Sequence, residues 1–430
     1  MNICVVGLGK IGLPLAVQFA SKGFRVTGAD IDPDVVSAVS AARAHPGEPG
    51  LAEALADAIG RGRFTATTDV TAAVASCQAV VIAVPLMLTA DGRPDFFAVD
   101  AATRAIGAGL REDTLVSFET TLPIGTTRGR IGPMLAEASG LTVGEGFHLV
   151  FSPERVFTGR VFKDLRRYPK LVGGVNEAST RRAVDFYRRV LDFDDRPDLN
   201  KPNGVWDMGS CETAEFAKLA ETTYRDVNIG LANQFARHAD RIGVDLATVV
   251  EACNTQPYSH IHRPGIAVGG HCIPVYPQLY LVGDPDATVV EAARAANATM
   301  PDHAIGVLAE TYGDLAGATV LILGAAYRGG VKETAYSGVF PLVDRLTDLR
   351  AEPLVSDPMY TAEELTGLGL PAYGGQAVDA LIVQSDHIEY KDLTAADWPG
   401  VKVLYDGRGV TDAALWHGVR RIVLGGASTA

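Results

Sequence analysis

The first thirty residues limit the possible folds more than any other part of the chain. An apolar segment, residues 2–6, runs directly into the glycine motif Gly7-Leu-Gly9-Lys-Ile-Gly12. An apolar segment with helical spacing follows, and then a strand-like run, residues 25–29, which ends at Asp30. This order of strand, GxGxxG, helix, strand and acid is typical of a dinucleotide-binding βαβ unit. A glycine turn at an ordinary strand–helix junction is the alternative interpretation.

The same motif indicates which dinucleotide would bind. The N-terminus of the helix offers free N–H groups and a favourable dipole for a pyrophosphate. The Asp30 carboxylate would accept hydrogen bonds from the adenosine ribose and repel a 2′-phosphate, so we expect NAD rather than NADP. Asp32 is a second candidate for that role. The expected cofactor contacts are Gly7, Gly9, Lys10, Ile11, Gly12, Asp30, Val84, Pro85, Thr121 and Glu154.

Three more apolar runs predict that the sheet continues. They cover residues 79–84, 114–118 and 148–151, and they alternate with segments of helical pattern. Such alternation predicts a parallel, doubly wound sheet, in which ligands bind at the carboxyl ends of the strands. Thr121 and Glu154 follow two of these strand ends, which makes them candidates for the site. A turn-forming hydroxyl and a solvated or salt-bridged carboxylate are the ordinary alternatives.

A long helix is predicted for residues 212–242, which contain no proline and one glycine. Four polar side chains of this helix share one face because they are spaced by three or four residues. They are Lys218, Glu221, Thr222 and Arg225. That face either lines a cavity or faces solvent.

One cysteine stands in a loop of unusual composition. Residues 265–277 bracket Cys272 with three glycines and two prolines. Glycine lets a backbone turn sharply and approach a ligand closely, and proline fixes the far side of the loop. This frame predicts that the Cys272 thiol is presented as a covalent nucleophile. A free cysteine that is only a small buried hydrophobe is the alternative.

A short basic cluster, His260, His262 and Arg263, precedes this loop. Two histidines at this spacing, without a clear third ligand, do not predict a metal site, and we expect none. Arg263 is a candidate partner for a phosphate.

Composition argues against several classes of protein. The length of 430 residues predicts two or three domains. The net charge of −13 argues against a general nucleic-acid binder. No apolar run is long enough to predict a membrane span, and no basic-then-apolar start predicts a signal peptide. The five cysteines are widely spaced without a CxxC pair, so a reducing cytoplasm is the expected compartment.

A second α/β domain is predicted in the last third of the chain. Residues 319–324 read as a buried strand that enters another glycine-rich stretch, and four further strand-like runs follow. Because no complete GxGxxG is present there, we expect no second NAD site. Arg328, Lys332 and Arg408 lie near predicted strand ends, where they would either grip a diphosphate or form ordinary surface charges.

Several motifs occur in order along the whole chain. They are GLGKIGLPLA (7–16), GEPGL (47–51), ETTLPIGTT (119–127), SPERV (152–156), RDVNIGLAN (225–233), GGHCIPVYP (269–277) and GAAYRGGVKE (324–333). In this order and spacing the chain resembles the UDP-glucose/GDP-mannose dehydrogenase family, and most of all its branch acting on UDP-N-acetylhexosamines. The resemblance implies an α/β fold of two Rossmann-like doubly wound domains joined by a long central helix. The implied domains are an NAD-binding domain (1–200), a central helical domain with the cysteine loop and dimer interface (201–310), and a nucleotide-sugar-binding domain (311–430).

The family's activity is an NAD-dependent four-electron oxidation that turns the C6 hydroxymethyl of a nucleotide sugar into a carboxylate, a uronic acid unit for polysaccharide biosynthesis. By this resemblance, Cys272 would form a thiohemiacetal and then a thioester, and Lys218 would stabilise the oxyanion. Glu154 and Thr121 would handle a catalytic water or the proton. The implied substrate contacts are Glu154, Arg155, Val156, Phe157, Lys218, Arg225, His260, Arg263, Gly265, Gly269, Tyr327, Arg328 and Arg408.

Three positions depart from the family pattern. Thr222 stands where the family usually has asparagine, one helical turn after the lysine, and keeps a hydroxyl for the same catalytic role. Tyr276 replaces the usual acid four residues after the cysteine, which leaves Glu154 to activate water. Ala335 replaces an expected arginine in the third domain.

Two other functions fit part of the sequence. A two-electron hydroxy-acid dehydrogenase of similar layout would need the lysine but not Cys272. A non-catalytic nucleotide-binding protein would tolerate the three departures. As partners, the resemblance implies a nucleotide-sugar substrate, above all a UDP-sugar, and a homodimer or dimer-based oligomer built through the long helix.

Overall fold

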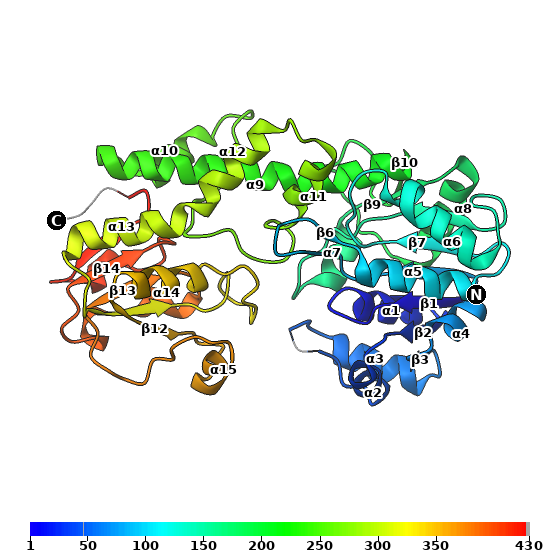
Figure 1. The fold of residues 1–430 in the computed structure, drawn as a ribbon, viewed down its shortest axis with the longest axis horizontal. Helices are drawn as coiled ribbons and strands as arrows, with labels where there is room; N and C mark the ends of the chain where they lie inside the picture. Colours follow the sequence, from blue (N-terminus) through cyan, green and yellow to red (C-terminus); the bar gives the residue numbers. More distant parts are fainter. Residues whose placement is uncertain (46, 427–430) are drawn as a thin grey trace. The chain divides into compact units, whose positions relative to one another are not determined.

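The computed structural model describes residues 1–45 and 47–426 (Figure 1). The chain divides into two compact units. The first unit comprises Met1–Glu221 and Gln278–Gly283, and the second comprises Thr222–Pro277 and Asp284–Ala430. This division falls inside a helix and does not test the three domain ranges, which remain a prediction.

The first unit contains an eight-stranded sheet with the order β10-β9-β8-β7-β4-β1-β2-β3. Its strands are β1 (Asn2–Val6), β2 (Arg25–Ala29), β3 (Phe64–Thr67), β4 (Ala79–Ile82), β7 (Leu115–Phe118), β8 (His148–Phe151), β9 (Lys170–Gly174) and β10 (Val205–Ser210). A short antiparallel pair, β5 (Met87–Leu88) and β6 (Pro94–Asp95), forms a separate ribbon.

The polarity of the eight-stranded sheet changes once. All neighbouring strands from β3 to β8 are parallel, whereas β9 is antiparallel to β8, and β10 is parallel to β9. The strands predicted from the sequence are therefore parallel to one another, whereas β9 and β10, which were not predicted, run in the opposite direction. Because Phe151 pairs with Gly173, the same register continued beyond β8 places Glu154 opposite Lys170. The start of β9 thus lies at the sheet edge where β7 and β8 end.

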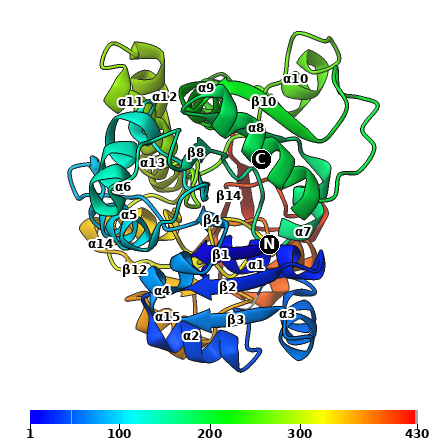
Figure 2. The ribbon, with the colours of Figure 1, turned by 90° about the vertical axis from the view of Figure 1, so that its right-hand side faces the viewer.

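Helices cover both faces of this sheet. Figure 2 shows α1, α3 and α7 on one side of β1–β3 and α4, α5 and α6 on the other. Apolar side chains of α1, α3, α7 and α8 share one core with the strands. The helices are α1 (Gly12–Ser21), α2 (Pro33–Ser40), α3 (Leu51–Gly60), α4 (Val70–Ala75), α5 (Phe97–Gly109), the π-helical turn η1 (Thr127–Ile131), α6 (Gly132–Ser139), α7 (Val161–Arg167) and α8 (Glu177–Val190).

The long helix predicted from the sequence is present as α9 (Cys211–Ile242), which runs from the first unit into the second. The later helices are α10 (Leu246–Cys253), α11 (Tyr276–Gly283), α12 (Thr288–Ala298), α13 (Met300–Tyr312), α14 (Val339–Asp348) and α15 (Ala362–Gly367). The short 3-10 turns are η2 (Ile388–Asp392), η3 (Ala395–Asp397) and η4 (Ala413–Leu415).

The second unit contains a parallel five-stranded sheet with the order β12-β11-β13-β14-β15. Its strands are β11 (Thr319–Leu323), β12 (Glu352–Ser356), β13 (Ala380–Val383), β14 (Val403–Asp406) and β15 (Arg420–Val423). Alternate residues of β11 face two separate cores, as the period of a strand requires. Val320 and Ile322 lie in the core formed with α13 and α14, whereas Leu321 and Leu323 pack with Trp416.

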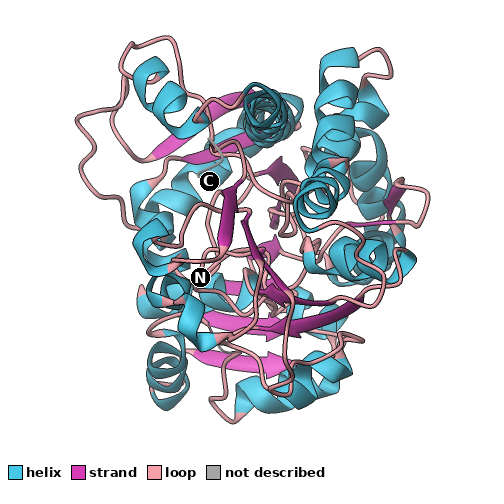
Figure 3. Ribbon diagram, turned by 90° about the vertical axis from the view of Figure 1, so that its left-hand side faces the viewer, coloured by secondary structure: helices cyan, strands magenta, loops and turns pink. Residues whose placement is uncertain are grey.

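Figure 3 shows helices and strands packed side by side. The predicted fold class is confirmed: the chain is α/β, with two Rossmann-like doubly wound domains joined by a long central helix. Within the described part of the chain, no helix combines the length and apolar character needed to cross a membrane.

Candidate functional site

The loop between β1 and α1 has the shape expected for a dinucleotide. Gly7 adopts a φ of +90°, which favours glycine, and a Cβ on Gly12 would lie 1.8 Å from the Gly7 carbonyl oxygen. A Cβ on Gly9 would meet no atom within 4 Å. Lys10 and Ile11 complete the loop, and no side chain caps the N-terminus of α1. The open space at Gly9, beside uncapped N–H groups, fits a pyrophosphate.

Asp30 directly follows β2 and is half-buried beside this loop. Its Oδ2 accepts the Leu8 N–H at 2.7 Å, and its Oδ1 accepts the Asp32 N–H at 3.0 Å. These bonds fix the carboxylate where the fingerprint places the ribose of NAD. Asp32 has another task, because its side chain caps α2 by accepting the Asp34 N–H at 2.8 Å. Asp30 is therefore the better of the two candidates.

The other predicted cofactor contacts follow β4 and β7. Val84 and Pro85 come just after β4, and Thr121 is buried in the segment after β7. The neighbouring Thr120 hydroxyl donates to the Val84 carbonyl at 2.5 Å, which ties the two loops together. The structure holds these residues at the carboxyl edge of the sheet, and their contacts with NAD remain predictions.

Lys218 of α9 reaches the loop that follows β8. Its Nζ donates to the backbone carbonyl of Glu154 at 2.7 Å, and only 7% of the lysine is exposed. Thr222, one helical turn later, is also buried, whereas Glu221 and Arg225 are exposed. The polar face of α9 is therefore divided between two buried residues and two at the surface.

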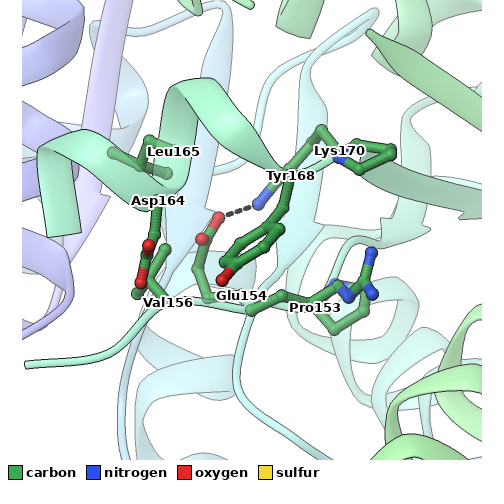
Figure 4. Close-up of a pocket in the computed structure, with 9 residues that line it drawn as sticks. Pro153, Glu154, Val156, Asp164, Leu165, Tyr168 and Lys170 are labelled. Carbon is green, nitrogen blue, oxygen red and sulfur yellow. Dashed lines mark hydrogen bonds and ion pairs between the residues drawn. The ribbon is translucent and has the colours of Figure 1, made fainter. Parts of the chain in front are cut away.

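Glu154 also belongs to a buried ion cluster that sequence reasoning missed. Lys170, the first residue of β9, donates to Glu119 Oε2 at 2.7 Å and also contacts Glu154 Oε1 (Figure 4). The Tyr187 hydroxyl lies 2.5 Å from Glu119 Oε1 and 2.7 Å from the Ser117 hydroxyl. The side chains of Lys170, Glu119 and Glu154 are 4%, 0% and 9% exposed. A lysine that opens an otherwise apolar strand is the sequence signal that points to this cluster.

The two carboxyl groups of the cluster are shifted in opposite directions. Burial raises the pKa of Glu119 well above its usual value, although the Lys170 ammonium opposes this shift. Burial is also the largest single influence on Glu154, but the Lys170 ammonium, the hydrogen bond with Glu119 and the Lys218 ammonium together outweigh it, and the pKa of Glu154 falls below its usual value. The pKa of Lys170 is raised, because the two carboxylates outweigh the effect of its burial.

The loop after β8 is held by its own protein contacts. Arg155 pairs with Glu221 of α9, with 2.8 Å between Nε and Oε2. Val156 packs against the core, and the Phe157 N–H donates to Asp164 at 3.0 Å. The Arg155 guanidinium is thus engaged in an ion pair within the first unit, and a role for it in substrate binding remains a prediction.

In the second unit, the cysteine loop packs against the glycine-rich stretch after β11. The Gly270 N–H donates to the Ala335 carbonyl at 2.8 Å. A Cβ on Gly269 would lie 2.3 Å from the Tyr327 Cβ, so only glycine fits there. Cys272 itself is a half-buried free thiol. Ala335 secures the loop through its backbone, a contact that does not depend on the arginine expected at this position.

The start of the cysteine loop is held by a buried chain of hydrogen bonds. Asn233 of α9 accepts the Gly265 N–H at 2.9 Å and donates to Asn297 at 2.8 Å. Asn297 donates to Asp226 Oδ1 at 2.8 Å, and the same oxygen pairs with Arg294 at 2.9 Å. This network links α9 and α12 to the loop that carries the thiol.

Two arginines predicted to bind the diphosphate, Arg328 and Arg408, lie near the cysteine loop. A Cβ on Gly265 would lie 2.5 Å from Arg408 Nη1, so Arg408 packs directly on the loop. Arg408 also pairs with Asp386 at 3.3 Å. Arg328 donates to the Tyr327 hydroxyl at 3.3 Å. The structure therefore brings Gly265, Tyr327 and both arginines into one region of the second unit.

The basic residues before the cysteine loop are mostly at the surface. Arg225, His260 and Arg263 are exposed, and His262 is half-buried. Burial lowers the pKa of His262, and the nearby Arg225 and His260 lower it further. In residues 1–45 and 47–426, no three His, Cys, Asp or Glu side chains gather closely enough to hold a metal ion.

The acid beside the glycine-rich stretch after β11 is buried by the protein itself, so a dinucleotide could not reach it. Asp357 directly follows β12, as Asp30 follows β2, and accepts the N–H groups of Ala325 and Ala326 at 2.9 and 3.0 Å. Its side chain is 0% exposed and contacts the buried His387 at 3.1 Å. The Asp357 carboxylate thus offers no accessible oxygen to a ribose, in contrast to half-buried Asp30.

The glycine loop and its acid place the first unit among the NAD-binding domains of dehydrogenases. Family models identify the chain more closely. Three models of the UDP-glucose/GDP-mannose dehydrogenase family match it in succession: the NAD binding domain at residues 1–191, the central domain at 212–299 and the UDP binding domain at 321–413. The chain belongs to the UDP-glucose/GDP-mannose dehydrogenase family.

Individual relatives agree with this result. A UDP-N-acetyl-D-mannosamine dehydrogenase from Pyrococcus horikoshii is 34% identical over 421 residues, which cover 95% of this chain and 96% of the relative. A solved structure of a UDP-D-ManNAc dehydrogenase from P. horikoshii covers 100% of both chains, with 31% identity and a TM-score of 0.89. A UDP-glucose dehydrogenase from Pyrobaculum islandicum is 29% identical, covering 100% of this chain and 98% of that one, with a TM-score of 0.87. The protein is therefore an NAD-dependent dehydrogenase of nucleotide sugars.

Proposed function

We propose that this chain oxidises the C6 hydroxymethyl group of a UDP-N-acetylhexosamine to the uronic acid, through a thioester on Cys272. The observation that carries the proposal is the half-buried Cys272 thiol in a chain that belongs to this family. The loop that holds the thiol packs closely through its glycines against the rest of the second unit. Relatives named as UDP-N-acetyl-D-mannosamine dehydrogenases support an N-acetylated sugar. UDP-glucose is the second candidate substrate, because a UDP-glucose dehydrogenase is nearly as similar in sequence.

The proposed reaction has four steps. Bound NAD⁺ accepts one hydride in each of the two oxidations. The first oxidation removes a hydride from C6 and a proton from its hydroxyl, which gives an aldehyde. The Cys272 thiolate adds to the aldehyde carbon and forms a thiohemiacetal, whose oxidation gives the thioester. Water then displaces the thiol, so each sugar loses two hydrides and gains one oxygen atom from water.

Lysine, glutamate and threonine side chains are assigned to the oxygen atoms of the substrate and of the attacking water. The buried Lys218 ammonium would stabilise negative charge on the C6 oxygen, where a low dielectric strengthens the interaction. Glu154 would remove a proton from the water that attacks the thioester. The buried hydroxyls of Thr121 and Thr222 would orient the water and the C6 oxygen.

Tyr276 supports the assignment of Glu154 as the base. Tyr276 is the first residue of α11, and its N–H donates to the Cys272 carbonyl at 2.9 Å. A phenol does not supply the carboxylate that the family pattern has at this position, so the role of base is assigned to Glu154. The remaining substrate contacts predicted from the sequence, and the three domain ranges, form part of the same proposal.

The proposal includes a homodimer formed through α9 in the cytoplasm. Four large apolar side chains lie exposed along one face of this helix within the second unit. They are Tyr224 (54% exposed), Leu231 (41%), Phe235 (37%) and Ile242 (56%). A partner helix would cover them. All five cysteines are free thiols, which suits a reducing compartment.

Counting NADH formed per sugar tests the mechanism. Wild type, Cys272→Ser and Cys253→Ser are each given NAD⁺ and a panel of UDP-N-acetylhexosamines, UDP-glucose and GDP-mannose. We expect two NADH per sugar for wild type and for Cys253→Ser, whose half-buried cysteine lies outside the loop. Cys272→Ser should lose turnover. One NADH per sugar, unchanged by Cys272→Ser, would indicate a two-electron dehydrogenase, and no NADH with any sugar would indicate a non-catalytic protein.

A further inference from the structure

Lys170 bridges two carboxyl groups that have different surroundings. Its Nζ contacts Glu119 Oε2, Glu154 Oε1 and, at 3.3 Å, the carbonyl oxygen of Ser152. Glu119 is completely enclosed, whereas Glu154 lies nearer the surface and also has the Lys218 ammonium close by. Glu154 therefore faces two cations and Glu119 faces one.

Burial favours a proton on one of these two carboxyl groups, because an ionised carboxylate is costly in the interior unless cations offset it. Glu119 is fully enclosed, and its ion-pair partner is the Lys170 ammonium, which it shares with Glu154. The second ammonium, on Lys218, acts on Glu154. Because Glu154 has the second cation and more contact with solvent, the proton is better placed on Glu119.

The surroundings of Glu119 accommodate that proton. Tyr187 of α8 lies 2.5 Å from Glu119 Oε1, and its hydroxyl is in turn 2.7 Å from the Ser117 hydroxyl, where either oxygen can donate. Tyr187 donates to Glu119 Oε1. A proton on Glu119 is then shared in a hydrogen bond with the Glu154 carboxylate, which helps to lower the pKa of Glu154.

We propose that Lys170 and Glu119 are positioning residues that keep Glu154 ionised, with the one proton of the two carboxyl groups held on Glu119. The inference rests on the proposed role of Glu154 as the base of thioester hydrolysis. It explains how the reaction proceeds with Tyr276 in place of an acid: the base is prepared from inside the sheet. The other titratable groups around Glu154 are Lys218 of α9, Arg155, Asp164 and Tyr168, of which Arg155, Asp164 and Tyr168 line the pocket in Figure 4.

Infrared difference spectroscopy measures the protonation of Glu154 without reference to activity. The acid titration of each protein is recorded, and the same background with Glu154→Gln is subtracted to isolate the Glu154 carboxylate band. Lys170→Met should move the titration midpoint up by about one pH unit or more, because burial then acts without the ammonium. Lys170→Arg, which keeps the charge, and Glu119→Gln, a neutral substitute for the protonated acid, should stay within about half a unit of wild type.

Two results would overturn the inference. Either the midpoint for Lys170→Met matches that of wild type, or the midpoint for Glu119→Gln falls by about a unit or more, which would place the proton on Glu154. Lys163→Met, which removes an exposed lysine from α7, is the matched control and should leave the titration unchanged. If Lys170→Met does not fold, Lys170→Arg and Glu119→Gln still decide the result.

The pH dependence of kcat connects the cluster to catalysis. The acid limb should shift upward in Lys170→Met, with about a tenfold loss of rate per pH unit on that limb and recovery at higher pH. A purely structural lysine would lower kcat equally at all pH values and would leave the infrared midpoint unchanged. If the infrared midpoint moves and the acid limb does not, the inference stands and the proposed role of Glu154 as base fails.

Discussion

The side-chain oxygen of Asn233 accepts the backbone N–H of Gly265 at 2.9 Å. The amide of the same side chain donates to Asn297 at 2.8 Å, so one residue of α9 holds both α12 and the start of the cysteine loop. Asn233 is completely buried. If the Asn233 amide is removed, neither the Gly265 N–H nor the Asn297 side-chain oxygen can form a hydrogen bond with water instead.

Asn233→Ala should therefore lower the free energy of unfolding by about 2–4 kcal/mol, because two buried groups lose their partner. Urea unfolding at neutral pH measures this change. Asn228→Ala is the matched control, since Asn228 lies on the same helix with its hydrogen bond near the surface, and should change stability by less than about 0.5 kcal/mol. Equal losses in the two variants would contradict the importance of the buried chain.

Glu215 should make stability depend on pH. It is buried on α9 and accepts the N–H groups of Gly125 at 2.6 Å and Thr127 at 2.8 Å. Burial raises its pKa to about 7, against these hydrogen bonds and from an ordinary value of 4.5. The folded protein therefore holds this proton more tightly than the unfolded chain, and the stabilisation is lost as pH rises through about 7.

The free energy of unfolding of wild type, relative to Glu215→Gln, should fall by up to about 3 kcal/mol between pH 4.5 and 8. Urea unfolding at several pH values measures the difference. Glu212, one turn earlier, is the control, because its hydrogen bond with Arg128 lowers its pKa to about 2. Glu212→Gln should give a difference that is flat over this range. A flat difference for Glu215→Gln as well would contradict the prediction.

Asp30 should control the affinity for the cofactor. Asp30→Ala removes the acceptor of the Leu8 N–H and the expected partner of the ribose, so NAD⁺ binding should weaken at least about tenfold. Asp30→Asn should narrow the preference for NAD⁺ over NADP⁺, because the charge that repels a 2′-phosphate is gone. Calorimetric titration measures both constants. Asp34→Asn, at an exposed acid in the first turn of α2, should bind NAD⁺ like wild type.

The exposed face of α9 should carry the dimer. Leu231→Glu combined with Phe235→Glu places two charges in the proposed interface, and we expect the protein to become a monomer. Sedimentation velocity over a range of concentrations measures the mass. Leu368→Glu changes a leucine of nearly the same exposure, 40% against 41% for Leu231, in a different part of the second unit and should not alter assembly. A dimer that survives the double change would place the interface elsewhere.

Features that depend on neighbouring residues could be predicted from the sequence. The glycine loop is one, because Gly7 and Gly12 are required by a turn and a close helix–strand approach that lie within six residues. The length of α9 is another, since proline-free helical spacing is a local property. The predicted strand ends at Glu154 and Thr121 were also correct, because both follow apolar runs that form strands.

Features that depend on strand order could not be predicted in this way. Lys170 is distant in sequence from Glu119, and only the pairing of β9 beside β8 brings them together. The ion pair between Arg155 and Glu221 likewise follows from the packing of α9 against the loop after β8. Composition and residue spacing do not predict either contact, because each joins segments that are brought together only by the tertiary fold.

The direction of strand β9 also determines how firmly the backbone of Lys170 is held. In a parallel sheet, the carboxyl edge receives side chains only from residues that leave a strand, and these sit on connecting segments that shift when their lengths change. Lys170 enters the edge from the opposite direction, as the first residue of a strand paired on both sides. The position of the Lys170 backbone is therefore set by strand pairing and not by the connecting segment that precedes it. One inverted strand thus brings a cation to this edge from a different backbone element than the one that carries Glu154.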